Sequence, residues 1–255
     1  MRIRREVAIG AAALLVFVLL FALTERIPQD PAYHAFADTR TILSTPNFWN
    51  VFSNLPFLVV GLWGLSIVMP RSNELLGGQR ASMLVLFSGV ILTAFGSSYY
   101  HLAPDNATLF WDRLAMTIAF AGLFTTMLGL YVTPVASRKL LLPFVLLGGG
   151  SVLYWRVSEA AGAGDLRAYA IVQFLPMLAM LGLLSLRGDR SPLTPWLWAT
   201  FALYVASKIF EHADAPLYAA IGLSGHALKH VAAALGVAAF ALGLSRTLGK
   251  LTAER

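Results

Sequence analysis

The stretch Ser97-Ser-Tyr-Tyr-His-Leu-Ala-Pro-Asp-Asn-Ala-Thr-Leu-Phe-Trp-Asp112 joins two long apolar runs through a short polar turn. His101 ends the first run and Asp112 opens the second. We therefore expect both side chains at one face of a membrane, on antiparallel helices joined near Pro104-Asp105. A charge inside hydrocarbon costs about 2.5–3.5 kcal/mol on insertion scales, so ionisable groups placed there are functional candidates. The stretch predicts both a helical hairpin and the location of a site.

Composition assigns the chain to the membrane class. Of its 255 residues, 58% are hydrophobic and 13% are charged, and the mean hydropathy is +0.70, values outside the range of soluble domains. The net charge is +6, but the basic residues are scattered between apolar runs, so we expect no nucleic-acid partner. Because the chain has no cysteine, disulfides are excluded and a metal ion would need nitrogen and oxygen ligands.

Apolar runs of membrane-spanning length recur along the chain. The run from Val7 to Leu23 is either a signal peptide or a retained helix that could act as a signal anchor. We favour the helix because no good cleavage site follows it. Further spans are predicted at about 48–69, 81–101, 110–132, 140–155, 168–186, 196–210 and 225–245. The fold prediction is an all-α, polytopic membrane helix bundle.

Lysine and arginine are unequally divided between the alternating loops of this layout. Twelve fall on one side and four on the other, while Arg113, Lys208 and Lys229 lie within spans or at their ends. The positive-inside rule places the richer side, with both termini, in the cytoplasm. The predicted hairpin of residues 97–112 then turns at the outer, periplasmic or lumenal, face.

Three histidines and one acid share that outer depth. His226 and His230 are four residues apart, so their imidazoles project from one helix face and can bind one ion. His101 adds a third nitrogen, which completes the ligand set of a catalytic zinc site. Ser97 lies one helical turn before His101, where it could orient this ligand or stabilise an oxyanion. Asp112 could hold or deprotonate a water molecule.

Each of these residues also has a purely structural interpretation. The histidines of the last span could be satisfied by polar neighbours, Ser97 could bond to its own helix, and Asp112 could pair with Arg113. We interpret the polar residues 211–214 as a solvated cluster at the membrane interface and expect Lys208 to extend to the same interface.

Together the residues resemble those of the alkaline ceramidase family. The resemblance rests on Ser97-x-x-x-His101, on Asp112, on His226-x-x-x-His230, and on Asn47-Phe48-Trp49-Asn50 followed by Ser53-Asn54-Leu55-Pro56. The wider superfamily, which includes adiponectin-type receptors, shares the zinc motif without the Phe-Trp-Asn opening. The resemblance implies a seven-helix ceramidase-like domain at 33–245. A transmembrane helix and linker at 1–32 would precede it, and a basic cytoplasmic tail at 246–255 would follow.

The resemblance also implies an activity. Zinc would be held by His101, His226 and His230, with Asp112 activating water and Ser97 assisting. The expected enzyme is a hydrolase of sphingolipid metabolism that cleaves the amide of a ceramide-like lipid to a fatty acid and a free sphingoid base. Its partners would be the membrane and that lipid substrate.

One departure from the family concerns calcium. Eukaryotic members are similar to one another in carrying an acidic calcium-binding segment just before the first core helix. Here residues 33–38 are Tyr-His-Ala-Phe-Ala-Asp, so Asp38 is the one carboxylate in this segment, and Asn47 stands where an acid is expected. The departure makes calcium doubtful, and with it the transfer of the family's substrate preference to this chain.

Two other functions remain open from the sequence. The same zinc site could hydrolyse a different lipid, such as an N-acyl amino acid lipid or an ester, or the zinc could be structural in a receptor-like bundle. A transporter is disfavoured because the ionisable groups cluster at one face, with no matching set near the midplane or the inner side. The sequence does not define the oligomeric state.

Overall fold

The computed structural model describes residues 18–19, 21–187 and 191–253. Within these residues the structure is helical and contains no β-strand, which confirms the predicted all-α class. The elements are η1 (Pro31–His34), α2 (Phe48–Phe52), α3 (Leu55–Val68), α4 (Arg80–Leu102), α5 (Asn106–Tyr131), α6 (Pro134–Ala160), α7 (Arg167–Arg187), α8 (Thr194–His212), α9 (Asp214–Ile221) and α10 (Gly225–Ala253).

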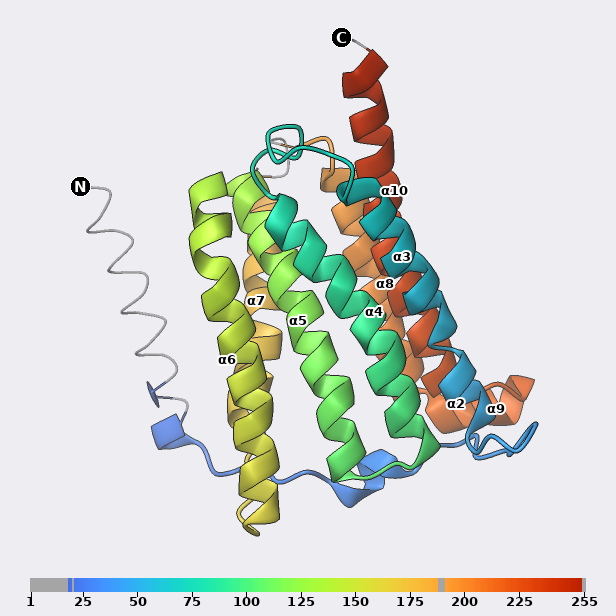
Figure 1. The fold of residues 1–255 in the computed structure, drawn as a ribbon. Helices are drawn as coiled ribbons and strands as arrows, with labels where there is room; N and C mark the ends of the chain where they lie inside the picture. The colour runs from blue at the N-terminus through green and yellow to red at the C-terminus, as the bar shows by residue number, and fades with distance from the viewer. Residues whose placement is uncertain (1–17, 20, 188–190, 254–255) are drawn as a thin grey trace.

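The long helices form a closed ring. Each packs against the next from α3 through α8, α8 packs against α10, and α10 returns to α3. The short helices α2 and α9 lie together at one end of this bundle, and residues 25–47 pass the last turns of α6 and then run below the ends of α5 and α4 at that same end (Figure 1). The α2–α9 end is therefore the end at which α4 finishes and α5 and α10 begin.

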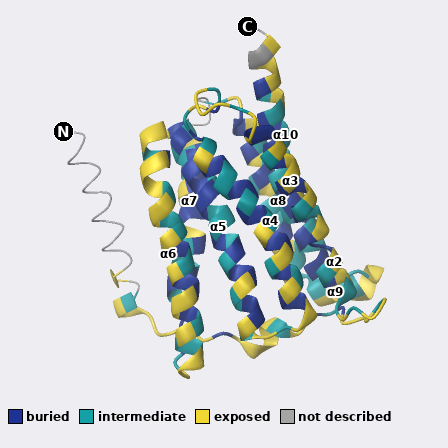
Figure 2. Cartoon of the chain, viewed as in Figure 1, coloured by how far each residue is buried: buried dark blue, intermediate teal, exposed yellow. Residues whose placement is uncertain are grey.

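The distribution of side chains is that of a membrane protein. Large apolar residues are exposed, including Phe95, Leu146 and Leu178, while His101 and Asp112 are buried. Figure 2 shows that exposed and buried residues share the long helices of the bundle. In the described part of the chain, six segments have the length and apolar composition to cross a bilayer: Phe48–Val68, Arg80–Leu102, Asn106–Tyr131, Pro134–Ala160, Arg167–Leu186 and Gly225–Lys250. The chain thus has the make-up of an integral membrane helical bundle.

The full predicted number of spans is larger than six. α8 has a place in the ring and matches the span predicted at 196–210, but it is not among the six segments. Most of the helix predicted from Val7 to Leu23 lies outside the described residues, of which 18–19 and 21–23 are helical. The count of seven core helices plus one stays a prediction.

Two helix boundaries differ from those expected. The first core span is broken at Ser53-Asn54 into α2 and α3, because Pro56 in the first turn of α3 has no N–H to continue the hydrogen-bond ladder. α10 continues to Ala253, beyond the span predicted to end near residue 245. Leu244 and Leu248 are both buried, so the packed face of α10 extends into the predicted tail.

Candidate metal centre

A tight turn brings the end of α4 next to the start of α5. Asp105 caps α5 through its side chain, which accepts hydrogen bonds from the backbone N–H groups of Ala107 (2.8 Å) and Thr108 (2.7 Å). The Thr108 hydroxyl in turn accepts from the Asp105 N–H at 3.1 Å, which completes a capping box. The helical hairpin predicted around Pro104-Asp105 is confirmed.

Close contact between α4 and α5 brings Ser97 and Asp112 together. Gly96 permits the contact, because a Cβ atom at this position would lie 2.6 Å from the Trp111 carbonyl oxygen. Ser97 and Asp112 are both buried and line the same cavity. Ser98 faces elsewhere and donates to the Val51 carbonyl at 3.2 Å.

The start of α10 is held by side chains from other elements. The carboxylate of Asp214 in α9 accepts the backbone N–H of His226 at 2.8 Å with one oxygen and that of Ala37 at 2.9 Å with the other. The hydroxyl of Ser224 accepts the N–H of Ala227 at 3.0 Å and donates to Asn50 Oδ1 at 3.1 Å. These bonds set the position from which His226 projects.

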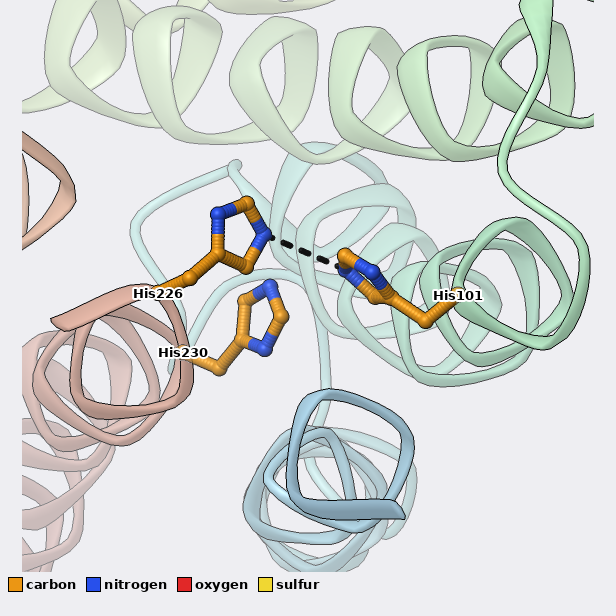
Figure 3. A group of neighbouring side chains, drawn as sticks. All are labelled: His101, His226 and His230. Carbon is orange, nitrogen blue, oxygen red and sulfur yellow. Dashed lines mark hydrogen bonds between the residues drawn. The ribbon is translucent and has the colours of Figure 1, made fainter. Parts of the chain in front are cut away.

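His101, His226 and His230 meet inside the α2–α9 end. Figure 3 shows the three rings turned toward one another, His101 from α4 and the other two from α10. One nitrogen from each ring lies within 4.8 Å of the others. The Nε2 atoms of His101 and His226 are 3.3 Å apart, and all three side chains are at most 5% exposed. The structure therefore contains a buried group of three nitrogens able to hold a metal ion.

The geometry and donor set of this group suit zinc. Two nitrogens bound at 2.0–2.1 Å to a tetrahedral zinc ion are about 3.3 Å apart, the separation of the His101 and His226 Nε2 atoms. A hydrogen bond between two imidazoles would account for that pair but not for the third ring directed at the same point. Three neutral imidazoles are also the ligand set of a catalytic zinc site with one open position.

Ser53 determines how the His230 ring is presented. Its hydroxyl donates to the Asn50 carbonyl at 3.2 Å and lies 2.8 Å from His230 Nδ1. We assign the proton of this ring to Nδ1, which then donates to Ser53 Oγ and leaves the Nε2 lone pair free for a metal. The role of Ser53 as the hydrogen-bond partner of a candidate ligand emerges from the structure.

We expect Ser53→Ala to weaken zinc binding by about 10- to 100-fold, because the His230 ring loses the partner that fixes its orientation. Competition with a chromophoric chelator measures the affinity. Ser66→Ala is the matched control, since Ser66 lies on the same predicted span but is exposed and bonds to its own helix. Equal affinity in the Ser53 variant and the wild type would contradict the assigned hydrogen bond.

The other two histidines do not join the group. Both ring nitrogens of His34 have partners, the Tyr100 hydroxyl at 2.9 Å and Asn106 Oδ1 at 3.0 Å. His212 is exposed at the end of α8. His34 and His212 are therefore natural controls for changes to the three central histidines.

A cavity of about 320 Å³ borders the metal centre. His230, Asp112 and Ser97 line it at the α2–α9 end, and its wall extends along α4 to Leu86. Leu86 and Ser97 are eleven positions apart on α4, which corresponds to about 16 Å of helix. Most of the wall beyond the polar end is apolar. The cavity thus has the shape and polarity for an elongated apolar ligand with one polar end.

An ion-pair cluster lies at the polar end of the cavity. Glu211 binds Lys208 at 2.8 Å through one carboxylate oxygen and Lys229 at 2.6 Å through the other. All three residues line the cavity, so the prediction that residues 211–214 are simply a solvated cluster was wrong for Glu211. The i, i+3 spacing of Lys208 and Glu211 signals the first pair. The second pair joins α8 to α10 and has no local signal.

The residues in place of the family's calcium segment make other contacts. Both carboxylate oxygens of Asp38 accept hydrogen bonds from the Arg40 guanidinium, at 2.9 and 2.6 Å. Burial raises the pKa of Asp38, but the hydrogen bonds and charge of Arg40 outweigh this effect and lower it below its usual value. Asn47 Nδ2 donates to the His101 carbonyl at 2.9 Å. The Asn47 hydrogen bond connects the segment before α2 to the end of α4 that carries His101.

Comparison with known proteins identified no relative of this chain. No protein-family model, curated protein or solved structure matches the chain. The interpretation of the centre therefore depends on the geometry described above.

Proposed function

We propose that this protein is a zinc-dependent intramembrane hydrolase that cleaves the amide bond of an N-acyl lipid, of the ceramide-like class implied by the resemblance to alkaline ceramidases. The observation that carries the proposal is the buried group of His101, His226 and His230 beside Asp112 and Ser97. A purely structural metal site has no need of an acid and a hydroxyl beside an elongated apolar cavity.

Each group of residues has a separate role in the proposed reaction. His101, His226 and His230 would hold zinc, and bound zinc supplies a Lewis acid that activates water and polarises the amide carbonyl. Asp112 accepts the proton of the attacking water and returns it to the departing amine nitrogen. Ser97 orients the Asp112 carboxylate and can donate to the oxygen of the carbonyl under attack. Water and amide are converted to a carboxylic acid and a free amine.

The cavity supports a lipid as the substrate. Its apolar length receives the acyl chain, while the polar end keeps the amide beside Asp112 and His230. The proposal also includes an arrangement in the membrane: seven core helices and one N-terminal helix, both termini in the cytoplasm and the site near the outer face, as the distribution of lysine and arginine predicts.

A panel of lipids tests the reaction. Purified, zinc-loaded protein is incubated with ceramides, N-acyl amino acids and an ester of equal chain length, and products are identified by mass spectrometry. We expect fatty acid and free amine in equal amounts from the N-acyl lipids. Release of neither product from any amide, by protein shown to contain zinc, would contradict the proposal.

A further inference from the structure

Arg113 is a buried cation that forms no salt bridge within the described residues. Its side chain is 5% exposed, and it is absent from the ion pairs found in that part of the chain. Nη2 donates to Gln29 Oε1 at 2.6 Å, whereas Nη1 is buried without a hydrogen-bond partner. The pairing of Arg113 with Asp112, which the sequence left open, is not formed.

Aromatic rings hold the guanidinium in position. Its carbon lies 4.2 Å from the ring centre of Trp155, 4.9 Å from that of Tyr169 and 5.5 Å from that of Tyr33. Cation–π contacts orient a guanidinium and offset part of its desolvation. They leave its positive charge in place, and a buried charge without an opposite charge is unfavourable.

The polar end of the cavity carries an excess of positive charge. Arg113, Lys208 and Lys229 line it together with Asp112 and Glu211, three cations and two carboxylates before any metal ion is counted. Both oxygens of Glu211 are engaged by the two lysines. The polar end therefore keeps a net charge of +1, and Arg113, one residue along α5 from the proposed proton acceptor, is its cation that forms no salt bridge within the described residues.

We propose that Arg113 recognises an anionic group on the substrate, so that this site acts on N-acyl lipids whose amine part bears a carboxylate or a phosphate, in preference to neutral ceramides. The preference in hydrolysis rests on the proposed function. The preference in binding does not depend on whether the protein is a hydrolase. A planar guanidinium with a free N–H is suited to either oxyanion through charge-assisted hydrogen bonds, whereas a neutral head group offers the guanidinium no opposite charge.

Binding of matched amphiphiles tests the inference. Calorimetry on the protein in lipid nanodiscs compares N-palmitoylglycine, hexadecyl phosphate and the neutral N-palmitoylethanolamine. We expect both anionic ligands to bind the wild type about tenfold or more tightly than the neutral one, since a charge-assisted hydrogen bond has this magnitude. Inorganic phosphate measures the anion without a chain and is expected to bind at least tenfold more weakly than hexadecyl phosphate. Equal binding of the two phosphates, or of the glycine and ethanolamine ligands, would overturn the proposal.

Two variants test whether Arg113 causes the preference for anionic ligands. Arg113→Gln should remove the preference for anionic ligands. Gln29→Glu keeps the arginine but supplies a carboxylate where Oε1 now accepts from Nη2, so it should reduce the preference even if the first variant folds poorly. A preference that persists in a folded Arg113→Gln protein, or that is unchanged in Gln29→Glu, would assign the recognition to other groups.

The His101→Ala variant separates this inference from the proposed reaction. If Arg113 provides the recognition, the preference for anionic ligands survives in this variant although the metal centre is lost. If the preference disappears with His101 but persists in Arg113→Gln, a metal ion binds the anion and the inference is wrong. Neither outcome depends on whether any lipid is hydrolysed.

Discussion

Replacing His101, His226 or His230 by alanine, one at a time, is expected to reduce bound zinc from about one ion per chain to near zero, because two imidazoles no longer satisfy a tetrahedral ion. The three rings come from two helices and converge within 4.8 Å, so no neighbouring histidine can take over. Elemental analysis of the purified protein, with tryptophan fluorescence or circular dichroism to verify folding, measures the loss.

His34→Ala is the matched control for this result. His34 lies at the same end of the bundle, but its two ring nitrogens bind Tyr100 and Asn106. We expect its zinc content to equal that of the wild type. Undiminished zinc in all three single variants of the central histidines would show that the ion binds elsewhere.

Replacing Asp112 is expected to have the second large effect, on the rate of amide hydrolysis. Asp112→Asn should lower the rate of amide hydrolysis by about 10²- to 10⁴-fold, the usual contribution of a general base, while zinc remains bound. Asparagine has nearly the shape of aspartate but cannot accept the proton of the attacking water. Mass-spectrometric rates at saturating lipid, measured beside zinc content, distinguish loss of chemistry from loss of the metal.

Asp105→Asn provides the comparison on the same helix. Asp105 caps α5 at its exposed start, and asparagine caps a helix about as well as aspartate. Its rate should therefore match that of the wild type. Hydrolysis by Asp112→Asn at the wild-type rate would exclude this carboxylate as the proton acceptor.

Local features of the chain were predictable because their causes are local. The turn between α4 and α5 follows from two apolar runs separated by Pro104-Asp105, and the structure ends α4 at Leu102 and begins α5 at Asn106. The four-residue spacing of His226 and His230 places both rings on one face of α10 wherever that helix lies. Depth in a membrane is also readable from hydropathy, which brings His101 to the level of the other two histidines.

Contacts between distant segments were not predictable in the same way. Ser53 supports His230 across 177 positions of sequence, and Asp214 holds the first turn of α10 through the His226 N–H. Glu211 was interpreted as part of a solvated cluster, yet it bridges Lys208 and Lys229 in the cavity wall. Each depends on which helix faces come together, a property that no short window of sequence contains.

The sequence by itself determined that the chain is a helical membrane protein and that its histidines and Asp112 belong to one level of the bundle, because hydropathy and helical spacing act over a few turns. Only the tertiary structure decided which ring nitrogens face each other, which hydroxyl orients them and that Arg113 forms no salt bridge within the described residues. Those outcomes are set by the packing of α4, α5 and α10 at close range, where displacements of about 1 Å make or break a hydrogen bond.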